Sequence, residues 1–420
     1  MERLLGYSDE ISVHAGNSVA FKVSSPGAQP YRAQLVRLRC ADSDTAGPGF
    51  KEIPVAAPFD GEHTGREQPI GIGSWVETDA TDAFALSSFT LASFVYATTP
   101  GEREQALLGT WDPATRRGFG LSLDARGAPA LAVGDGRRRG LVATGTPLLA
   151  SHWYLIAASY DAERGEATLW QLPQFTYAVG SDAVHVRDNL GTFALPGGAM
   201  RMAAWQRDGL PSDCFNGKLE APWVAERALE RDEIERFAAA EGESDAVAGL
   251  VARWDFSREQ ATRRVVDLGS HALHGRTENL PTRAVRGRRW DGTQHRFGEA
   301  PAHYAAIHFH EDDLYDCKWE TDFVYDVPDE LPSGLYAAKL EGDAQQEYLP
   351  FYVRPAPGAK HRDLALLIPT ASYYAYANFH INTEWDFSEH VLNFFTILDA
   401  EAHYLQTHFE LGASTYDSHT

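Results

Sequence analysis

The feature that most constrains the fold is a series of short apolar runs between residues 61 and 299. Runs such as FTLASFVY, QALLGTW, GFGLSLD and WYLIAASYD are separated by Gly, Asp and Pro. Regular short strands between turn residues are typical of an all-β sandwich, since a helical domain needs apolar residues at a spacing of three to four. The pattern therefore predicts an independently folded β-sandwich over residues 61–299.

Strand patterns also flank this region on both sides. Val19, Phe21 and Val23 alternate with more polar residues, and the much later segments LYAAKL and YLPFYV are typical of a β-hairpin. Each flanking stretch has roughly 50 to 60 residues, and a unit of that size with unpaired strand edges is marginally stable alone. We therefore predict one discontinuous immunoglobulin-like β-sandwich formed by residues 1–60 and 300–356.

One segment has a clear helical pattern. In residues 225–237, Leu229, Ile234 and Phe237 lie near helical spacing among charged residues. This spacing predicts a short helix with one face packed on the sheet beside it.

The pattern of apolar residues changes after residue 356. Residues 363–368, with the sequence DLALLI, form a continuous apolar run of the kind expected for a strand buried on both faces. We interpret residues 357–420 as the incomplete start of an α/β domain, because such a domain normally needs well over about a hundred residues. The predicted fold class is thus a multidomain, mainly β protein with the beginning of an α/β layer.

Charge and cysteine content exclude several functions. The 37 basic and 59 acidic residues give a net charge of −22, which disfavours nucleic acids and anionic membranes as partners. Cys40, Cys214 and Cys317 are far apart and fit neither a disulfide framework nor a thiolate zinc site. Because no apolar stretch is long enough to span a bilayer, we expect a cytoplasmic protein.

The central region resembles a known sandwich family. The segments FTLASFVYA, WYLIAASYDAERGEATLW and NGKLEAPWVAERALERDEIERF are similar to the laminin-G-like or concanavalin-like jelly roll. Members of this class often hold calcium or sugars, but the sequence shows no tight carboxylate cluster here. A spacer or a contact between subunits is the alternative role.

Two sets of residues could carry chemistry. The segment SYYAYAN, which includes Tyr373, Tyr374 and Tyr376, directly follows the predicted buried strand, and Tyr416 lies in STYD. Tyrosinate oxygens can bind ferric iron, although clustered tyrosines more often pack or bind apolar ligands. The rival set is His308 and His310 in HFHEDD, where alternate strand positions place both imidazoles on one face, as in some metal hydrolases. Structural histidines are the alternative reading of that set.

The order of these segments resembles the large-subunit family of N,N-dimethylformamidase. The likeness rests on VARWDFSRE, HALHGRTENLPTRAV, AIHFHEDD, IPTASYYAYAN and STYDSHT, and spans nearly the whole chain. It implies a mononuclear iron amidohydrolase, with the iron held by two tyrosines and one glutamate in a glutamine-amidotransferase-like α/β domain. Carried over residue by residue, Tyr376 and Tyr416 are the candidate metal ligands, with Tyr373 or Tyr374 as substitutes for Tyr376.

The same resemblance implies the reaction and the partners. It implies hydrolysis of a small N-substituted formamide to formate and an amine, a small accessory subunit, and a hetero-oligomer of large and small subunits. In the family, the glutamate ligand and a nearby histidine lie in a later segment, and no sequence similar to that segment occurs before Thr420. We therefore expect a fragment that is inactive alone, with the other ligands beyond Thr420. The alternative function is a non-catalytic β-sandwich protein that binds carbohydrate or protein.

Overall fold

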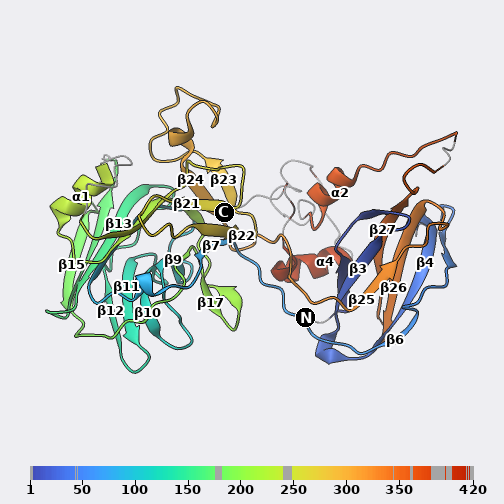
Figure 1. The fold of residues 1–420 in the computed structure, drawn as a ribbon, viewed down its shortest axis with the longest axis horizontal. Helices are drawn as coiled ribbons and strands as arrows, with labels where there is room; N and C mark the ends of the chain where they lie inside the picture. The colour runs from blue at the N-terminus through green and yellow to red at the C-terminus, as the bar shows by residue number, and fades with distance from the viewer. Residues whose placement is uncertain are drawn as a thin grey trace. The chain divides into compact units, whose positions relative to one another are not determined.

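The structure is a computed structural model that describes residues 3–42, 44, 46–175, 182–239, 248–343, 345–359, 363–379, 393, 400–412, 414 and 416. The chain divides into two compact units. The first comprises Met1–Ile70 with Asp316–Ala377, and the second comprises Gly71–Tyr315 with Asn378–Thr420. Strands dominate both units (Figure 1), so the prediction of a mainly β, multidomain protein is confirmed.

The first unit contains two sheets. Their strands are β1 (Leu5–Ser8), β2 (Ser12–His14), β3 (Ser18–Ser24), β4 (Tyr31–Ala41), β5 (Phe50–Pro54), β6 (Gly61–His63), β25 (Phe323–Asp326), β26 (Gly334–Gly342) and β27 (Gln345–Arg354). One sheet has the order β1-β3-β25, and the other has the order β2-β27-β26-β4-β5 with β6 paired to β4. Strands from the two ends of the chain therefore share both sheets.

The core of the first unit joins residues that are about three hundred positions apart. Val19, Phe21 and Val23 are fully buried, as their alternation in β3 predicts. The Phe21 ring stacks on Phe323 at 5.1 Å and meets the edge of Phe351 at 5.6 Å. Because Phe323 lies in the first sheet and Phe351 in the second, Phe21 helps to hold the two sheets together.

The second unit is built on one long, curled sheet. Its main strands are β7 (Trp75–Thr78), β8 (Phe89–Ala97), β9 (Gln105–Gly109), β10 (Arg117–Leu123), β11 (Pro129–Asp135), β12 (Arg139–Ala143), β13 (Trp153–Asp161), β14 (Glu166–Pro173), β15 (Val184–Asn189), β16 (Arg201–Met202), β19 (Gly217–Ala225), β20 (Leu250–Asp255), β21 (Arg264–Asp267), β22 (Gly275–Glu278), β23 (Thr282–Val285) and β24 (Ala306–Phe309). Strands β17 (Trp205–Arg207) and β18 (Leu210–Ser212) form a separate hairpin.

The curled sheet packs on itself. Its order is β12-β11-β10-β9-β16-β7-β22-β21-β20-β19-β8-β13-β14-β15, and β24 pairs with β19 and β23. Phe89 of β8 stacks on Phe119 of β10 with ring centres 4.3 Å apart, although the two strands are far apart in this order. The two halves of the sheet therefore face each other across a common apolar core, in the manner of a β-sandwich.

A helix covers the outer face of one half. The predicted helix over 225–237 is displaced, since β19 continues through Ala225 and α1 spans Arg231–Ala239. The helix begins late because Glu233 caps its first turn, accepting the Glu230 N–H at 3.1 Å and donating its own N–H to the Glu230 carbonyl at 3.0 Å. Phe237 packs edge-on against Trp223 at 4.6 Å. Consequently β8 and β13 are buried on both faces.

The prediction of a buried strand at residues 363–368 is wrong. This segment is assigned to no strand, and Leu364, Leu366 and Leu367 are each more than 80% exposed. A strand buried on both faces needs hydrogen-bonded neighbours, and none of the strands in the described ranges pairs with it. Two helices belong to the same end of the chain: α2 (Thr370–Tyr376) and α4 (Ala400–Thr407). No described helix is long and apolar enough to cross a membrane.

Candidate functional site

The candidate tyrosines are solvent-accessible. Tyr376 is the last residue of α2 and is 54% exposed, while Tyr416 lies in a turn and is 59% exposed. Tyr373 and Tyr374 are also exposed, by 50% and 63%. Tyr376 belongs to the first unit and Tyr416 to the second.

The segment before Tyr416 is held by local contacts. Asn378 donates its side-chain N–H to the Leu411 carbonyl at 2.7 Å, and the Tyr416 N–H donates to the Ser414 hydroxyl at 3.2 Å. Gly412 has φ +79°, and a Cβ added there would lie 3.0 Å from the Leu314 Cβ. The Tyr416 ring meets Phe379 edge-on at 6.3 Å. Tyr416 thus lies beside Phe379, and its assignment as an iron ligand stays a prediction.

The rival pair, His308 and His310, lies on one face as expected. Their ring centres are 4.2 Å apart at the end of β24. His310 is buried, and its Nδ1 lies 3.1 Å from Asp313 Oδ2, which also accepts the Ser74 hydroxyl at 2.6 Å. The Ser74 N–H donates to the His310 carbonyl at 2.9 Å. This double link between chain segments is a structural role for His310.

The carboxylate beside this pair is also engaged. Glu311 Oε1 accepts the Asn216 side-chain N–H at 2.9 Å, its N–H donates to Asn216 Oδ1 at 2.8 Å, and Arg103 forms an ion pair with its carboxylate. Over the described ranges no group of three or more His, Cys, Asp or Glu side chains could hold a metal ion. The contacts of residues 310–313 therefore connect the end of β24 to Ser74, Arg103 and Asn216.

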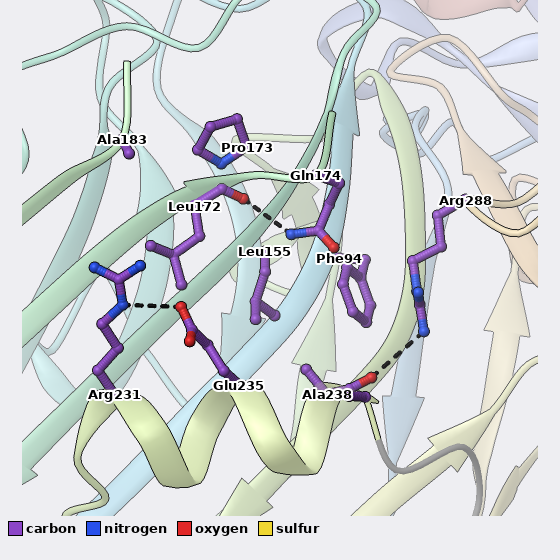
Figure 2. A pocket seen from close by; sticks show the side chains of 11 residues that line it. Phe94, Leu155, Leu172, Pro173, Gln174, Ala183, Arg231, Glu235, Ala238 and Arg288 are labelled. Carbon is purple, nitrogen blue, oxygen red and sulfur yellow. Dashed lines mark hydrogen bonds and ion pairs between the residues drawn. The ribbon is translucent and has the colours of Figure 1, made fainter. Parts of the chain in front are cut away.

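A cavity of about 370 Å³ lies between α1 and the sheet, with Phe94, Leu155 and Leu172 among its apolar lining (Figure 2). Its only acidic lining residue within the described segments is Glu235, which pairs with Arg231 at 2.8 Å. The Arg288 guanidinium lies 4.0 Å from the centre of the Phe94 ring. The charged groups of this cavity are thus occupied by contacts with the protein itself, and none is placed as a nucleophile.

A second cavity, of about 490 Å³, lies over β19 and β24. Besides Ala284 and Val285, its lining residues are polar or aromatic: Lys218, Arg286, Trp290, His295, Tyr304 and His308. Reasoning from the sequence singled out only His308. The others are scattered from position 218 to position 304, and no local pattern connects them before β19, β24 and the loop between β23 and β24 come together.

Comparison with known proteins finds relatives along almost the whole chain. Residues 282–420 match the family described as N,N-dimethylformamidase beta subunit-like, C-terminal. The N,N-dimethylformamidase beta subunit of Alcaligenes sp is 32% identical over an alignment of 441 positions, which covers 99% of this chain and 57% of that protein. Along almost its whole length, this chain is similar to N,N-dimethylformamidase beta subunits. The subunit of that name from Paracoccus aminophilus is 33% identical, with 99% of this chain and 58% of that protein covered.

Thus the chain spans less than two thirds of the dimethylformamidase subunits that it matches. Solved structures resemble it only weakly. A putative carbohydrate binding protein from Bacteroides ovatus has a TM-score of 0.36 at 14% identity and covers 63% of this chain and 68% of its own. The CBM40 domain of a Ruminococcus gnavus sialidase has a TM-score of 0.32 at 16% identity, covering 41% and 96%. Similarity at this level carries no argument about ligands.

Proposed function

We propose that this chain is part of an amide hydrolase that cleaves the C–N bond of a small N-substituted formamide, such as N,N-dimethylformamide. Water adds across the bond, so that the acyl part leaves as formate and the nitrogen part as dimethylamine. The observation that carries the proposal is the 32% identity along 99% of the chain to a protein named N,N-dimethylformamidase beta subunit. Because the chain spans 57% of that protein, the activity is proposed for the full-length protein.

We further propose that the enzyme uses one ferric ion, with Tyr376 and Tyr416 as ligands. Both phenols are more than half exposed and can each give one hard, anionic oxygen donor, so their residue type and accessibility suit ferric iron. Two phenolates do not complete a site, and the other donors would have to come from outside the described residues. Bound iron would polarise the formamide carbonyl and lower the pKa of a coordinated water.

A small accessory subunit is the proposed partner. The related proteins are named beta subunits, a name that supports an enzyme of more than one kind of chain. Co-expression with the accessory chain should give a complex that elutes together in size-exclusion chromatography. A full-length protein that is monomeric and fully active alone would contradict this partner.

The activity is tested by measuring formate released from N,N-dimethylformamide together with the iron content of the same preparation. We expect stoichiometric iron, a visible tyrosinate-to-iron charge-transfer band and formate production. Absence of both iron and formate in the full-length complex would favour the alternative, a non-catalytic binding protein. Formate production without iron would support the proposed hydrolase activity and contradict its dependence on iron.

The ligand assignment is tested by phenylalanine variants, which remove the oxygen and keep the ring. In Tyr376→Phe or Tyr416→Phe, iron content and turnover should fall together, with turnover reduced by about 100-fold or more, since even indirect partners of metal ligands are worth 10- to 100-fold. Tyr373→Phe and Tyr374→Phe are matched controls from the same helix. Loss of iron in either control with retention in Tyr376→Phe would move the ligand to the control position.

A further inference from the structure

The second cavity is a local concentration of positive charge in an acidic protein. The chain carries a net charge of −22, yet the two charged side chains that line this cavity, Lys218 and Arg286, are both cationic. None of its described lining residues is acidic, and no described carboxylate lies within 4 Å of the Lys218 or Arg286 cation. This lack of charge pairing contrasts with Arg231 and Glu235 in the cavity of Figure 2.

The sheet fixes the floor of this cavity. On β19, Lys218 pairs with His308 of β24 on one side and with Tyr96 of β8 on the other. The Lys218 ammonium lies 4.9 Å from the centre of the Tyr96 ring and 3.5 Å from the Arg286 carbonyl oxygen. Burial and the nearby Arg286 lower the pKa of Lys218, which means that this cation is held where water compensates its charge poorly. A bound anion would relieve that cost.

A preformed loop supplies the walls. The Trp290 indole N–H and the Tyr304 hydroxyl both donate to the Gln294 carbonyl, at 3.2 and 2.8 Å. The Arg286 guanidinium lies 4.8 Å from the centre of the Trp290 ring, and His295 meets the same ring edge-on at 6.3 Å. These contacts orient an aromatic wall and an exposed cation before any ligand arrives, which reduces the entropy lost on binding.

We propose that this cavity binds a small organic carboxylate with a planar or aromatic body. The carboxylate would lie between Lys218 and Arg286, and the body would pack against Trp290. A volume of about 490 Å³ falls within the range of small-molecule sites, about 300 to 1,000 Å³, and aromatic walls favour an organic anion over a fully hydrated inorganic one. The site does not depend on the proposed hydrolase activity.

Isothermal titration of the purified protein with benzoate tests the site. Benzoate should bind with a Kd in the millimolar range or tighter, and benzamide, which has the same ring without the charge, at least tenfold more weakly. Equal affinity for the two would overturn the proposal, because an apolar hollow does not need the cations. Binding of inorganic phosphate without benzoate, or no benzoate binding at all, would also overturn it.

Variants assign the binding to this cavity. Lys218→Met and Arg286→Gln should each weaken benzoate at least tenfold. Arg139→Gln is the matched control, because Arg139 also lies over a tryptophan, 5.4 Å from the Trp111 ring centre, but outside the cavity. Trp290→Leu keeps the assignment testable if Lys218→Met fails to fold, since Trp290 lies on a surface loop. Unchanged benzoate affinity in folded Arg286→Gln and Trp290→Leu would reject the cavity as the site.

Discussion

Two apolar runs of this chain differ in burial: one is a buried strand and the other is exposed. In β13, the run WYLIAASY is almost completely buried between two neighbouring strands, with an apolar core on one face and α1 near the other. In the run LALLI at residues 364–368, Leu364, Leu366 and Leu367 are exposed, and no described strand pairs with the run. The contrast shows that an apolar run becomes a buried strand only when the chain supplies hydrogen-bonding partners along its edges and side chains over its faces.

The largest expected effect concerns Phe21, whose contacts Phe323 and Phe351 lie about three hundred residues further along the chain. Phe21→Ala removes a fully buried ring that contacts Phe323 and Phe351. We expect the free energy of unfolding of the first unit to fall by about 3–5 kcal/mol, as for other buried phenylalanines. Val324→Ala is the control, since Val324 pairs with Ala20 in the same sheet but is half exposed. Urea unfolding that is equally affected by both variants would show that Phe21 does not join the sheets.

A more direct test compares the two runs themselves. Ile156→Ala in β13 leaves a cavity between covered faces and should cost about 2–5 kcal/mol of unfolding free energy. Leu366→Ala removes a side chain that is 83% exposed and should change that free energy by no more than about 0.5 kcal/mol. Thermal and urea denaturation of both variants measure the difference. A large loss in Leu366→Ala would mean that this run is covered in the protein in solution.

The sequence predicts secondary structure best where pattern and partners agree. The alternation of Val19, Phe21 and Val23 predicts β3 because one of its faces is fully buried. The sequence predicts too early a start for the helix because residues 225–230 have helical composition, while hydrogen bonds to β8 and β20 keep Ala225 in β19. Residues 363–368 were misread because the run alone does not specify its partners.

The candidate sites differ in how far the sequence can define them. Tyr376 and Tyr416 were reached through resemblance, since tyrosines in aromatic segments have no spacing specific to iron. The cationic cavity could not be foreseen, because Lys218, Arg286 and Trp290 meet only through strand pairing and a loop. His310 could be assigned only when its contact with Asp313 and Ser74 was visible.

Within the buried sheet, a single carboxylate gives a smaller and pH-dependent effect. Burial raises the pKa of Glu220 in β19, while the Arg288 backbone N–H at 2.7 Å and its guanidinium at 3.6 Å stabilise the charged form. A raised pKa favours folding at low pH, and that contribution is lost as pH rises through the folded value. Arg288→Met should therefore cost about 1–3 kcal/mol at pH 8 and less near pH 4, where Glu220 is protonated.

The control for this variant removes the negative charge of Glu220, with which Arg288 forms an ion pair. In the Glu220→Gln background, Arg288→Met should cost less and should show no such dependence on pH. Urea unfolding of the four proteins at pH 4, 6 and 8 gives the comparison. A penalty that is independent of pH in both backgrounds would assign the effect to the lost contact between Arg288 and the Phe94 ring instead.

The smallest expected effect separates a buried thiol from a more accessible one. Burial raises the pKa of Cys214 to about 12, and also that of Cys317 to about 11, whereas Cys40 lies partly exposed in β4. Because the thiolate is the reactive form, a disulfide reagent at pH 8 should label Cys40 first and leave Cys214 intact until the protein unfolds.

The raised pKa of Cys214 also stabilises the fold below its ordinary value of 9.0, and this contribution is lost between pH 9 and about 12. In Cys214→Ala, unfolding free energy should therefore fall less steeply above pH 9, by at most about 1.4 kcal/mol per pH unit. Rapid labelling of Cys214 in the folded protein would contradict the burial of this side chain beside Trp75 and Ala204.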